Sequence, residues 1–228
     1  MCKITLMSRA LGVLSLLAFL NGCASVSTRS TPFAGALAGV STLSADARAI
    51  VRETSANVSL YKPENGPALN LLAGVHVSDY FSAQGNYVWN RNTLMLSSFR
   101  TGDGTFFEER RRSGQHGFIA DGLLYFRDLD SWARPYLSAG VGLVRFQSSE
   151  PVLLASRGGP ARPPASFTST DPVLRVAVGI DLDTAAGWRI RYSFSEAIGA
   201  NPVSARLSPP AQRNLANFQN LIGAIKTF

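Results

Sequence analysis

Charge and cysteine are both scarce in this sequence, and their scarcity excludes several classes of protein. Of the 228 residues, 16% are charged, well below the roughly 25% of an average soluble domain. Such a composition argues against a disordered chain and against a highly charged nucleic-acid-binding arm. The two cysteines, Cys2 and Cys23, both lie near the N-terminus. Neither a disulfide framework nor a thiolate zinc site is therefore available to the rest of the chain.

Long apolar runs are missing as well. No apolar stretch reaches the ~18 residues that a membrane-spanning helix needs, and the 20 glycines follow no G-X-Y repeat. The net charge of +7 comes from 22 Lys/Arg and 15 Asp/Glu that are spread along the chain. The sequence has the length of one ordinary domain, and we expect no nucleic-acid partner.

The N-terminal segment has the pattern of a secretory signal peptide. Lys3 and Arg9 precede an apolar core over 10–20, and small residues follow in Gly22-Cys23-Ala24. This order of charge, apolar core and small exit residues predicts a signal peptide over 1–22. Leu20-Asn21-Gly22-Cys23 also resembles a bacterial lipobox, which implies lipidation of Cys23, although Asn21 departs from the usual pattern. Cleavage after Ala24 is the alternative. On either route the chain leaves the cytoplasm, and we expect 23–31 to be a short periplasmic N-terminal segment.

The rest of the chain alternates between apolar and polar residues with a period of two. This pattern predicts strands over 69–77, 81–90, 118–127, 174–182 and 188–195. Weaker versions of it extend over 33–43, 135–146 and 215–228, which gives eight strands in total. Three connections are short (78–80, 128–134 and 183–186), whereas four are long (44–66, 92–114, 147–171 and 198–215). Short and long connections alternate, so an up-and-down antiparallel sheet would carry all its long loops at one end.

The two faces of these strands differ sharply in composition. Polar and ionisable residues gather on one parity, and among them we expect an interior network of His76, Gln84, Asn86, Asp121, Arg127, Arg175, Asp181, Arg189 and Arg191. The other parity is apolar and carries aromatic residues toward the strand ends, namely Tyr87, Trp89, Phe118, Phe126, Trp188, Tyr192 and Phe194. Aromatic girdles that flank an apolar band are typical of membrane barrels. Turning an Arg toward the middle of the lipid would cost about 2–4 kcal/mol, so the polar face is expected inside.

Together, these features resemble the outer membrane protein beta-barrel domain family, the small OmpA/OmpX-like and opacity-protein barrels of Gram-negative bacteria. The resemblance covers about 32–228 and rests on the signal peptide, the eight amphipathic strands, the alternating connections and the terminal Phe228. It implies an eight-stranded antiparallel up-and-down transmembrane β-barrel in the outer membrane. It also implies contact with outer membrane lipids and lipopolysaccharide. Gly223 and Phe228 fit the family's signal for the barrel-assembly machinery, although Leu221 and Lys226 depart from it.

Other residues of chemical interest give weaker signals. His76 and His116 are the only histidines and have no companions at metal-ligand spacing. A charge run, Glu108-Glu109-Arg110-Arg111-Arg112, lies in the second long connection, and its arginines are suited to lipopolysaccharide phosphates. We expect no catalytic residues, no cofactor and no metal, and a monomer is the expected state.

The expected function is therefore a structural or surface-interaction role in membrane integrity, adhesion or recognition by loops. A small passive porin-like channel for ions or small solutes is the first alternative, with the interior charges as its selectivity filter. A lipid hydrolase on the barrel surface and a soluble calycin-like carrier complete the set of hypotheses.

Overall fold

The computed structural model describes residues 30–44, 47–50, 57–100, 103–158, 166–202 and 214–228. The predicted signal peptide, Cys23 and most of the 23–31 segment lie outside these ranges and stay predictions. Ten strands are present in the described residues: β1 (Thr31–Ser44), β2 (Ala47–Ile50), β3 (Asn57–Pro63), β4 (Gly66–His76), β5 (Phe81–Arg100), β6 (Phe106–Tyr125), β7 (Ala133–Arg157), β8 (Phe167–Ala185), β9 (Trp188–Ala200) and β10 (Asn214–Thr227). None of the described segments is a helix long and apolar enough to cross a membrane.

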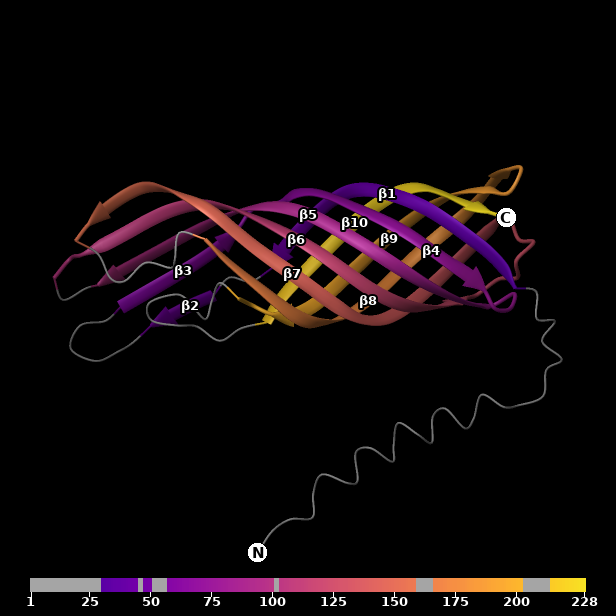
Figure 1. Cartoon of the computed structure of the whole chain (residues 1–228), viewed down its shortest axis with the longest axis horizontal. Coiled ribbons are helices and arrows are strands. Elements are labelled where there is room, and N and C mark those ends of the chain that lie inside the picture. Colours follow the sequence, from indigo (N-terminus) through magenta and orange to yellow (C-terminus); the bar gives the residue numbers. More distant parts are fainter. Residues whose placement is uncertain (1–29, 45–46, 51–56, 101–102, 159–165, 203–213) are drawn as a thin grey trace, which may run out of the picture.

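Eight of these strands close into a ring. The sheet runs β5-β4-β1-β10-β9-β8-β7-β6, and β6 pairs with β5 to complete it (Figure 1). Every pairing between these strands is antiparallel. The first and last strands meet directly, with Phe33 opposite Thr227. The predicted eight-stranded antiparallel barrel is therefore confirmed, and its closure leaves no exposed edge through the ring.

The register of the ring fixes the tilt of its strands. A row of paired residues starts at Tyr80, whose carbonyl accepts a hydrogen bond from Tyr125, and climbs once around the barrel to Asn90. It passes through Tyr136, Gly179, Ser193, Leu221, Gly39 and Ala68. The row returns to β5 ten positions beyond its start, from 80 to 90. A stagger of ten over eight strands corresponds to a tilt of about 40°.

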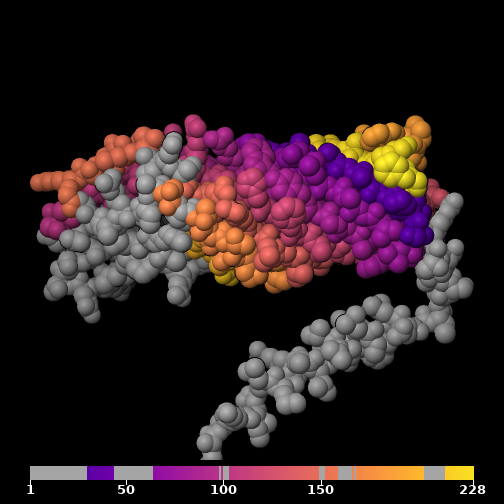
Figure 2. Space-filling model, in the orientation of Figure 1, coloured from indigo at the N-terminus to yellow at the C-terminus, as the bar shows by residue number. Residues whose placement is uncertain are grey.

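Side chains alternate strictly between the lumen and the outer wall. On β9, for example, Arg189, Arg191, Ser193 and Ser195 are buried while the residues between them are exposed. The outer wall is apolar, and Phe118, Val141 and Leu174 each expose more than 60% of their surface. The space-filling view shows this wall as continuous packed atoms (Figure 2). The arrangement is the reverse of a soluble barrel, in which the apolar side chains face inward.

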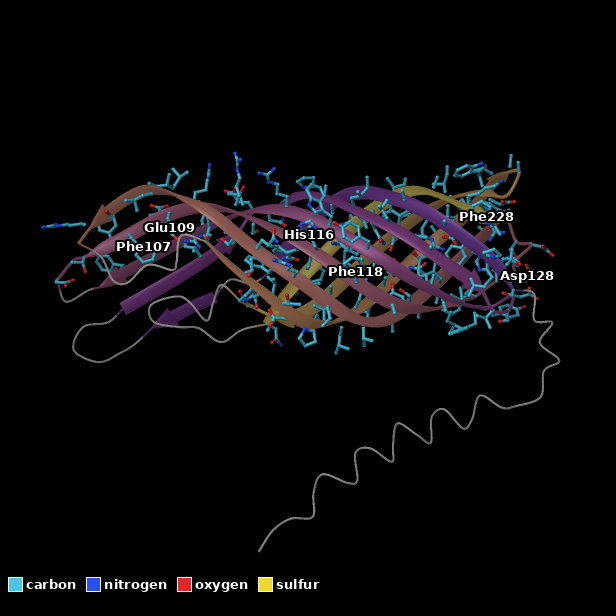
Figure 3. All side chains as sticks on the ribbon, in the orientation of Figure 1. Phe107, Glu109, His116, Phe118, Asp128 and Phe228 are labelled. Carbon is cyan, nitrogen blue, oxygen red and sulfur yellow. The ribbon has the colours of Figure 1, made fainter. Side chains whose placement is uncertain are left out.

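The three short connections lie at one end of the barrel, as the alternation predicted. Figure 3 shows Asp128 of the β6–β7 turn and Phe228 at this end, with Phe107 and Glu109 toward the other. In the β8–β9 turn, Ala186 and Gly187 have positive φ angles of 51° and 76°, the conformation of a tight hairpin turn. Tight turns at one end hold neighbouring strands in register.

The opposite end differs from the prediction, because much of what was expected to be loop is strand. The connections predicted over 92–114 and 147–171 largely continue as strand, since β5 reaches Arg100, β6 begins at Phe106 and β7 extends to Arg157. The hairpin of β2 and β3 pairs with the far part of β5. These strands project beyond the ring on one side (Figure 1). Mutual pairing of β5, β6 and β7 explains the extension, because backbone hydrogen bonds form wherever a neighbouring strand is present.

A substitution on the outer wall tests the orientation of the barrel. Val178 lies about halfway along the apolar part of β8 and is 49% exposed. We expect Val178→Arg to lower the free energy of unfolding by about 2–4 kcal/mol, because the guanidinium would face the middle of the acyl layer. The measurement is urea unfolding of the barrel in lipid vesicles.

Thr168→Arg is the matched control for Val178→Arg. Thr168 is exposed on the same strand, beyond the apolar band, so the same new side chain should change stability by less than about 1 kcal/mol there. Equal losses at both positions would show that the wall does not face lipid.

Candidate functional site in the barrel lumen

The lumen is filled by polar side chains from all parts of the ring. Eight of the nine residues predicted to form the interior network are buried there: His76, Gln84, Asn86, Asp121, Arg175, Asp181, Arg189 and Arg191. Arg127 is the exception. Strand β6 ends at Tyr125, so the alternation stops before Arg127, which is exposed in the following turn.

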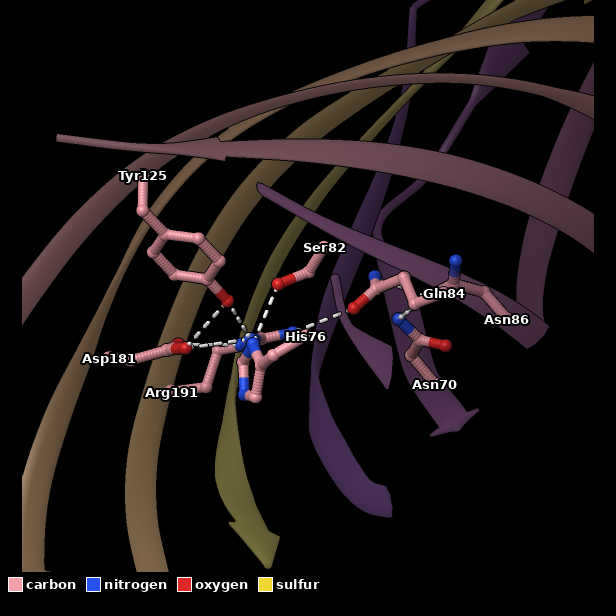
Figure 4. A network of polar contacts seen from close by, with 8 residues as sticks. All are labelled: Asn70, His76, Ser82, Gln84, Asn86, Tyr125, Asp181 and Arg191. Carbon is pink, nitrogen blue, oxygen red and sulfur yellow. Dashed lines mark hydrogen bonds and ion pairs between the residues drawn. The ribbon is translucent and has the colours of Figure 1, made fainter. Parts of the chain in front are cut away.

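Arg191 and Asp181 form the central ion pair of the lumen (Figure 4). Arg191 Nε donates to Asp181 Oδ1 at 2.6 Å and Arg191 Nη2 donates to Oδ2 at 2.7 Å, a bidentate geometry. Tyr125 Oη donates to Asp181 Oδ2 at 2.9 Å and accepts from Arg191 Nη2 at 2.8 Å. Arg191 Nη1 reaches across the lumen to Gln84 Oε1 at 2.8 Å. One guanidinium therefore links β5, β6 and β8 to β9.

A second ion pair continues this network toward the end opposite the tight turns. Arg175 Nη1 lies 3.1 Å from Asp121 Oδ2, and the same oxygen accepts from Asn86 Nδ2 at 3.0 Å. Asn86 Oδ1 in turn accepts from the amides of Gln84 and Asn70. Gly140 stands opposite Asp121, and a Cβ there would lie 2.0 Å from Asp121 Oδ1. The absence of a side chain at Gly140 therefore makes room for the buried carboxylate.

The end with the tight turns is closed by aromatic and cationic groups. The Arg134 guanidinium lies 3.7 Å from the centre of the Tyr125 ring, and the His76 ring stacks on Phe33 at 4.6 Å. His76 Nδ1 lies 2.6 Å from Ser82 Oγ. Arg189 donates to the carbonyl of Leu129 in the β6–β7 turn. Tyr125 and Arg134 were absent from the predicted network, although the alternation of β6 placed Tyr125 on its polar parity.

A small cavity of about 30 Å³ lies beyond Arg175, toward the projecting strands. Apolar residues including Val88, Ile119 and Val173 line it together with Asn90, Gln115 and Asn217. Asn217 Nδ2 donates to Asn90 Oδ1 and to Gln115 Oε1, each at 3.2 Å. Gln115 Nε2 and Asp121 Oδ1 are buried without a protein hydrogen-bond partner. A space of this size accommodates about two water molecules, which would satisfy Gln115 Nε2 because Gln115 lines the cavity.

The side chains of the charge run on β6 point alternately into the lumen and onto the outer wall. Arg111 was predicted to reach lipopolysaccharide, but it is buried, with Nη2 2.6 Å from Glu109 Oε1. Arg110 and Arg112 are exposed on the outer wall, and Arg110 lies 3.5 Å from Glu64. The prediction for Arg111 is wrong because the run is strand rather than loop, so its neighbours point in opposite directions.

The predicted aromatic residues lie on the outer wall at three heights. Phe126 and Trp188 adjoin the tight turns, and the wall there also carries Tyr80, Phe81 and Trp132. Tyr87, Trp89 and Phe118 lie toward the opposite edge of the apolar band, with Phe118 opposite Tyr87. Tyr192 and Phe194 lie between these edges, where Tyr192 Oη donates to Asn220 at 2.9 Å. Along β5, the two edges are eight positions apart, from Phe81 to Trp89, which at ~3.3 Å per residue and a ~40° tilt span ~20 Å.

The residues of the predicted assembly signal lie on or next to the closing strand. Gly223 stands opposite Leu37 on β1 and Arg191 on β9, and a Cβ there would lie 2.0 Å from the carbonyl oxygen of Ala36. Phe228 is 72% exposed, and its backbone N–H donates to the carbonyl of Pro32 at 2.9 Å. The terminal aromatic side chain is therefore free of the barrel while its backbone extends the β1–β10 pairing.

Comparison with solved structures identifies the class of fold. Neisserial surface protein A (NspA) superposes with a TM-score of 0.51 at 14% identity, over 86% of this chain and 97% of that one. OprG, an outer membrane protein from Pseudomonas aeruginosa, gives a TM-score of 0.52 at 12% identity, over 87% and 95%. This is the fold of a small outer membrane β-barrel. No protein-family model matches the sequence, and no curated protein matches it.

A double-mutant cycle tests the central ion pair. Arg191→Met would leave Asp181 as a buried, unpaired carboxylate, so we expect a loss of about 3–5 kcal/mol in the free energy of unfolding. Adding Asp181→Leu removes that charge as well and should restore part of the loss. Urea unfolding of the four proteins in lipid vesicles measures the coupling.

Asp183→Asn is the control for this cycle. Asp183 lies 3.6 Å from Arg189, but its side chain is 44% exposed, so its removal should cost less than about 1 kcal/mol. Additive losses for Arg191 and Asp181 would contradict a coupled pair.

Proposed function

We propose that this protein is a non-enzymatic β-barrel of the bacterial outer membrane with a structural and surface-interaction role. Strands β5, β6 and β7 and the β2–β3 hairpin would project from the cell surface, with the tight turns in the periplasm. The observation that carries the proposal is the combination of an apolar outer wall with a lumen crossed by two buried ion pairs, Arg191–Asp181 and Arg175–Asp121. The wall suits a lipid environment, and the ion pairs occupy the path that a solute would take.

The outer membrane accounts for both ends of the molecule. The tight turns on the periplasmic side are too short to form a binding surface. The projecting strands expose backbone and side chains to the cell exterior, where they can contact other molecules. The ring at mid-height consists of closed strands, which satisfy every backbone group internally, as a lipid environment requires. Adhesion, recognition and membrane integrity are the roles that such a scaffold serves, and a monomer is sufficient for each of them. The exposed Phe228 is available to the barrel-assembly machinery.

Extraction and gel mobility test the proposal directly. We expect the protein in the membrane fraction, with solubility only in detergent, and a faster band in unheated than in boiled SDS samples. The shift arises because a closed barrel with a hydrogen-bonded ring resists SDS until it is heated. Recovery in the aqueous fraction, or one band in both samples, would refute the membrane barrel in favour of a soluble carrier.

A passive channel is the second candidate, and the cavity beyond Arg175 is the observation in its favour. We expect no conductance steps from the native barrel in planar bilayers, because Arg191, Tyr125 and Gln84 meet across the lumen. Arg191→Ser should open a path and produce steps. Steps of similar size from both proteins would instead favour the channel.

The lipid-hydrolase hypothesis has little support in the described residues. His116 lies on the outer wall, where its Nδ1 is 2.8 Å from Tyr87 Oη. A base of this kind activates a nucleophile such as a Ser hydroxyl or a Cys thiol within hydrogen-bond reach. In the described ranges, the hydroxyl bonded to His116 is the Tyr87 phenol, and no Ser or Cys side chain is hydrogen-bonded to it. Mass analysis of lipid A with and without the gene tests this hypothesis.

A further inference from the structure

The outer wall carries two arginine side chains and one histidine side chain just beyond the apolar band, on three neighbouring strands. Arg91 on β5, His116 on β6 and Arg145 on β7 all have outward parity, and both arginines are exposed. Trp89 is opposite His116, and His116 is opposite Arg145. The three therefore lie directly above the aromatic edge formed by Tyr87, Trp89 and Phe118.

The tilt of the barrel brings these three residues to one height. Arg91 is paired with Gly114, which is paired with Gln147, but the paired row climbs slightly more than one residue per strand. On β6 and β7, the positions level with Arg91 therefore lie one to three residues nearer the tight turns than Gly114 and Gln147 do. The outward-facing residues at these positions are His116 on β6 and Arg145 on β7. On the other five strands of the ring, the corresponding outward positions are uncharged: Thr42, Pro67, Pro172, Ala200 and Ala216. Among the described ring residues at this height, the arginines are therefore confined to one sector of the rim.

A gap in the side-chain layer lies within this sector. Gly114 faces outward between Arg91 and the exposed Arg112, and a Cβ at Gly114 would have no heavy atom within 4 Å. Arg112 is opposite Thr93, which makes it a diagonal neighbour of Arg91, within reach of a shared ligand. Arg110 is paired with Glu64, whereas Arg91, Arg112 and Arg145 have no ion pair among the described residues.

A shallow apolar groove lies on the same outer wall, nearer to the tight turns. Gly85 and Ala120, which are opposite each other, lie in it. Tyr87, Phe118, Leu71 and Val141 flank them. A Cβ at Gly85 would also meet nothing within 4 Å, so the groove is open along its floor. Along β6, the outward-facing Phe118 comes between His116 and Ala120 of the groove.

We propose that this sector binds a phosphorylated, multiply acylated lipid of the outer leaflet, with Arg91, Arg112 and Arg145 on its phosphates and one acyl chain in the Gly85–Ala120 groove. Guanidinium groups bind phosphate in a planar, bidentate manner. The order of cationic rim, aromatic edge and apolar groove along the wall matches the order of headgroup, interface and chain in such a lipid. The site rests on the proposed function, because it requires the projecting strands to lie at the outer leaflet. It would fix a lipid to one side of the barrel.

Lipid titration followed by native mass spectrometry tests this site in the full-length barrel in detergent. The probes are bis-phosphorylated lipid A, the same glycolipid without its phosphates, and inorganic phosphate alone. We expect the phosphorylated lipid to bind at least about tenfold more tightly than the other two, since charge-assisted hydrogen bonds to several arginines contribute. Arg91→Gln with Arg145→Gln should weaken binding by about tenfold. Arg127→Gln, which removes an exposed arginine at the opposite end, should leave it unchanged.

Two glycine variants separate the headgroup from the chain. Gly114→Val fills the gap between the arginines without removing charge and should weaken binding of the phosphorylated lipid. Gly85→Leu fills the groove and should weaken binding of both lipids while leaving inorganic phosphate unaffected. Unchanged affinity in the double arginine variant would overturn the site, and so would equal affinity for lipid and inorganic phosphate.

The heat-dependent gel shift is recorded for every variant, so that only folded barrels are compared. A protein that shows the shift and extracts with the membrane but binds no lipid refutes the lipid site alone. A protein that shows neither shift nor membrane extraction refutes the proposed function.

Discussion

Closure of the ring through the pairing of its first strand, β1, with its last strand, β10, is the constraint on which the rest of this structure depends. Once the strands are closed with a stagger of ten, every residue of the ring is assigned to the lumen or to the outer wall. A slip of one residue in any strand would exchange the two sets. Here such a slip would turn Arg175, Asp181 and Arg191 outward and bring Leu174, Ile180 and Ile190 inward. The register is therefore fixed by side chains on both faces at once.

The charged side chains buried in the lumen are stabilised by hydrogen bonds to groups from several strands. An ion pair removed from water is stable only when its remaining hydrogen-bonding atoms are satisfied. Arg191 achieves this with one carboxylate, one phenol and one amide, and Asp181 receives three donated hydrogen bonds. Because Arg191 and these three partners come from four strands, the network also holds opposite sides of the ring at a fixed separation. Gly140 and Gly179 contribute by leaving room, since a Cβ at Gly179 would lie 2.4 Å from the Tyr136 ring.

The period-two alternation was sufficient to predict eight strands, and it correctly assigned the inward parity of most charged residues. It did not predict where strands begin and end. Arg111 and Arg127 show both consequences: β6 starts earlier than expected, which turns Arg111 inward, and ends at Tyr125, which leaves Arg127 outside. Strand ends depend on whether a neighbouring strand is present to pair with, which a local pattern does not record. The partner of each charged side chain depends on the stagger of the ring. The hydrogen bond between Arg191 and Gln84, which are 107 residues apart, could therefore not be predicted from the sequence.

Unequal strand lengths give the barrel two different sides, and this asymmetry links the fold to its surface chemistry. Strands β5, β6 and β7 have 20, 20 and 25 residues, whereas β9 and β10 have 13 and 14. The long side rises through the interface into water, so its wall passes from apolar to aromatic to cationic residues within a few positions. On the short side, the described residues of β9 and β10 end near the interface and show no such gradient. Arg91, Arg112 and Arg145 therefore lie where a charged headgroup meets a barrel wall, on the one side tall enough to present them.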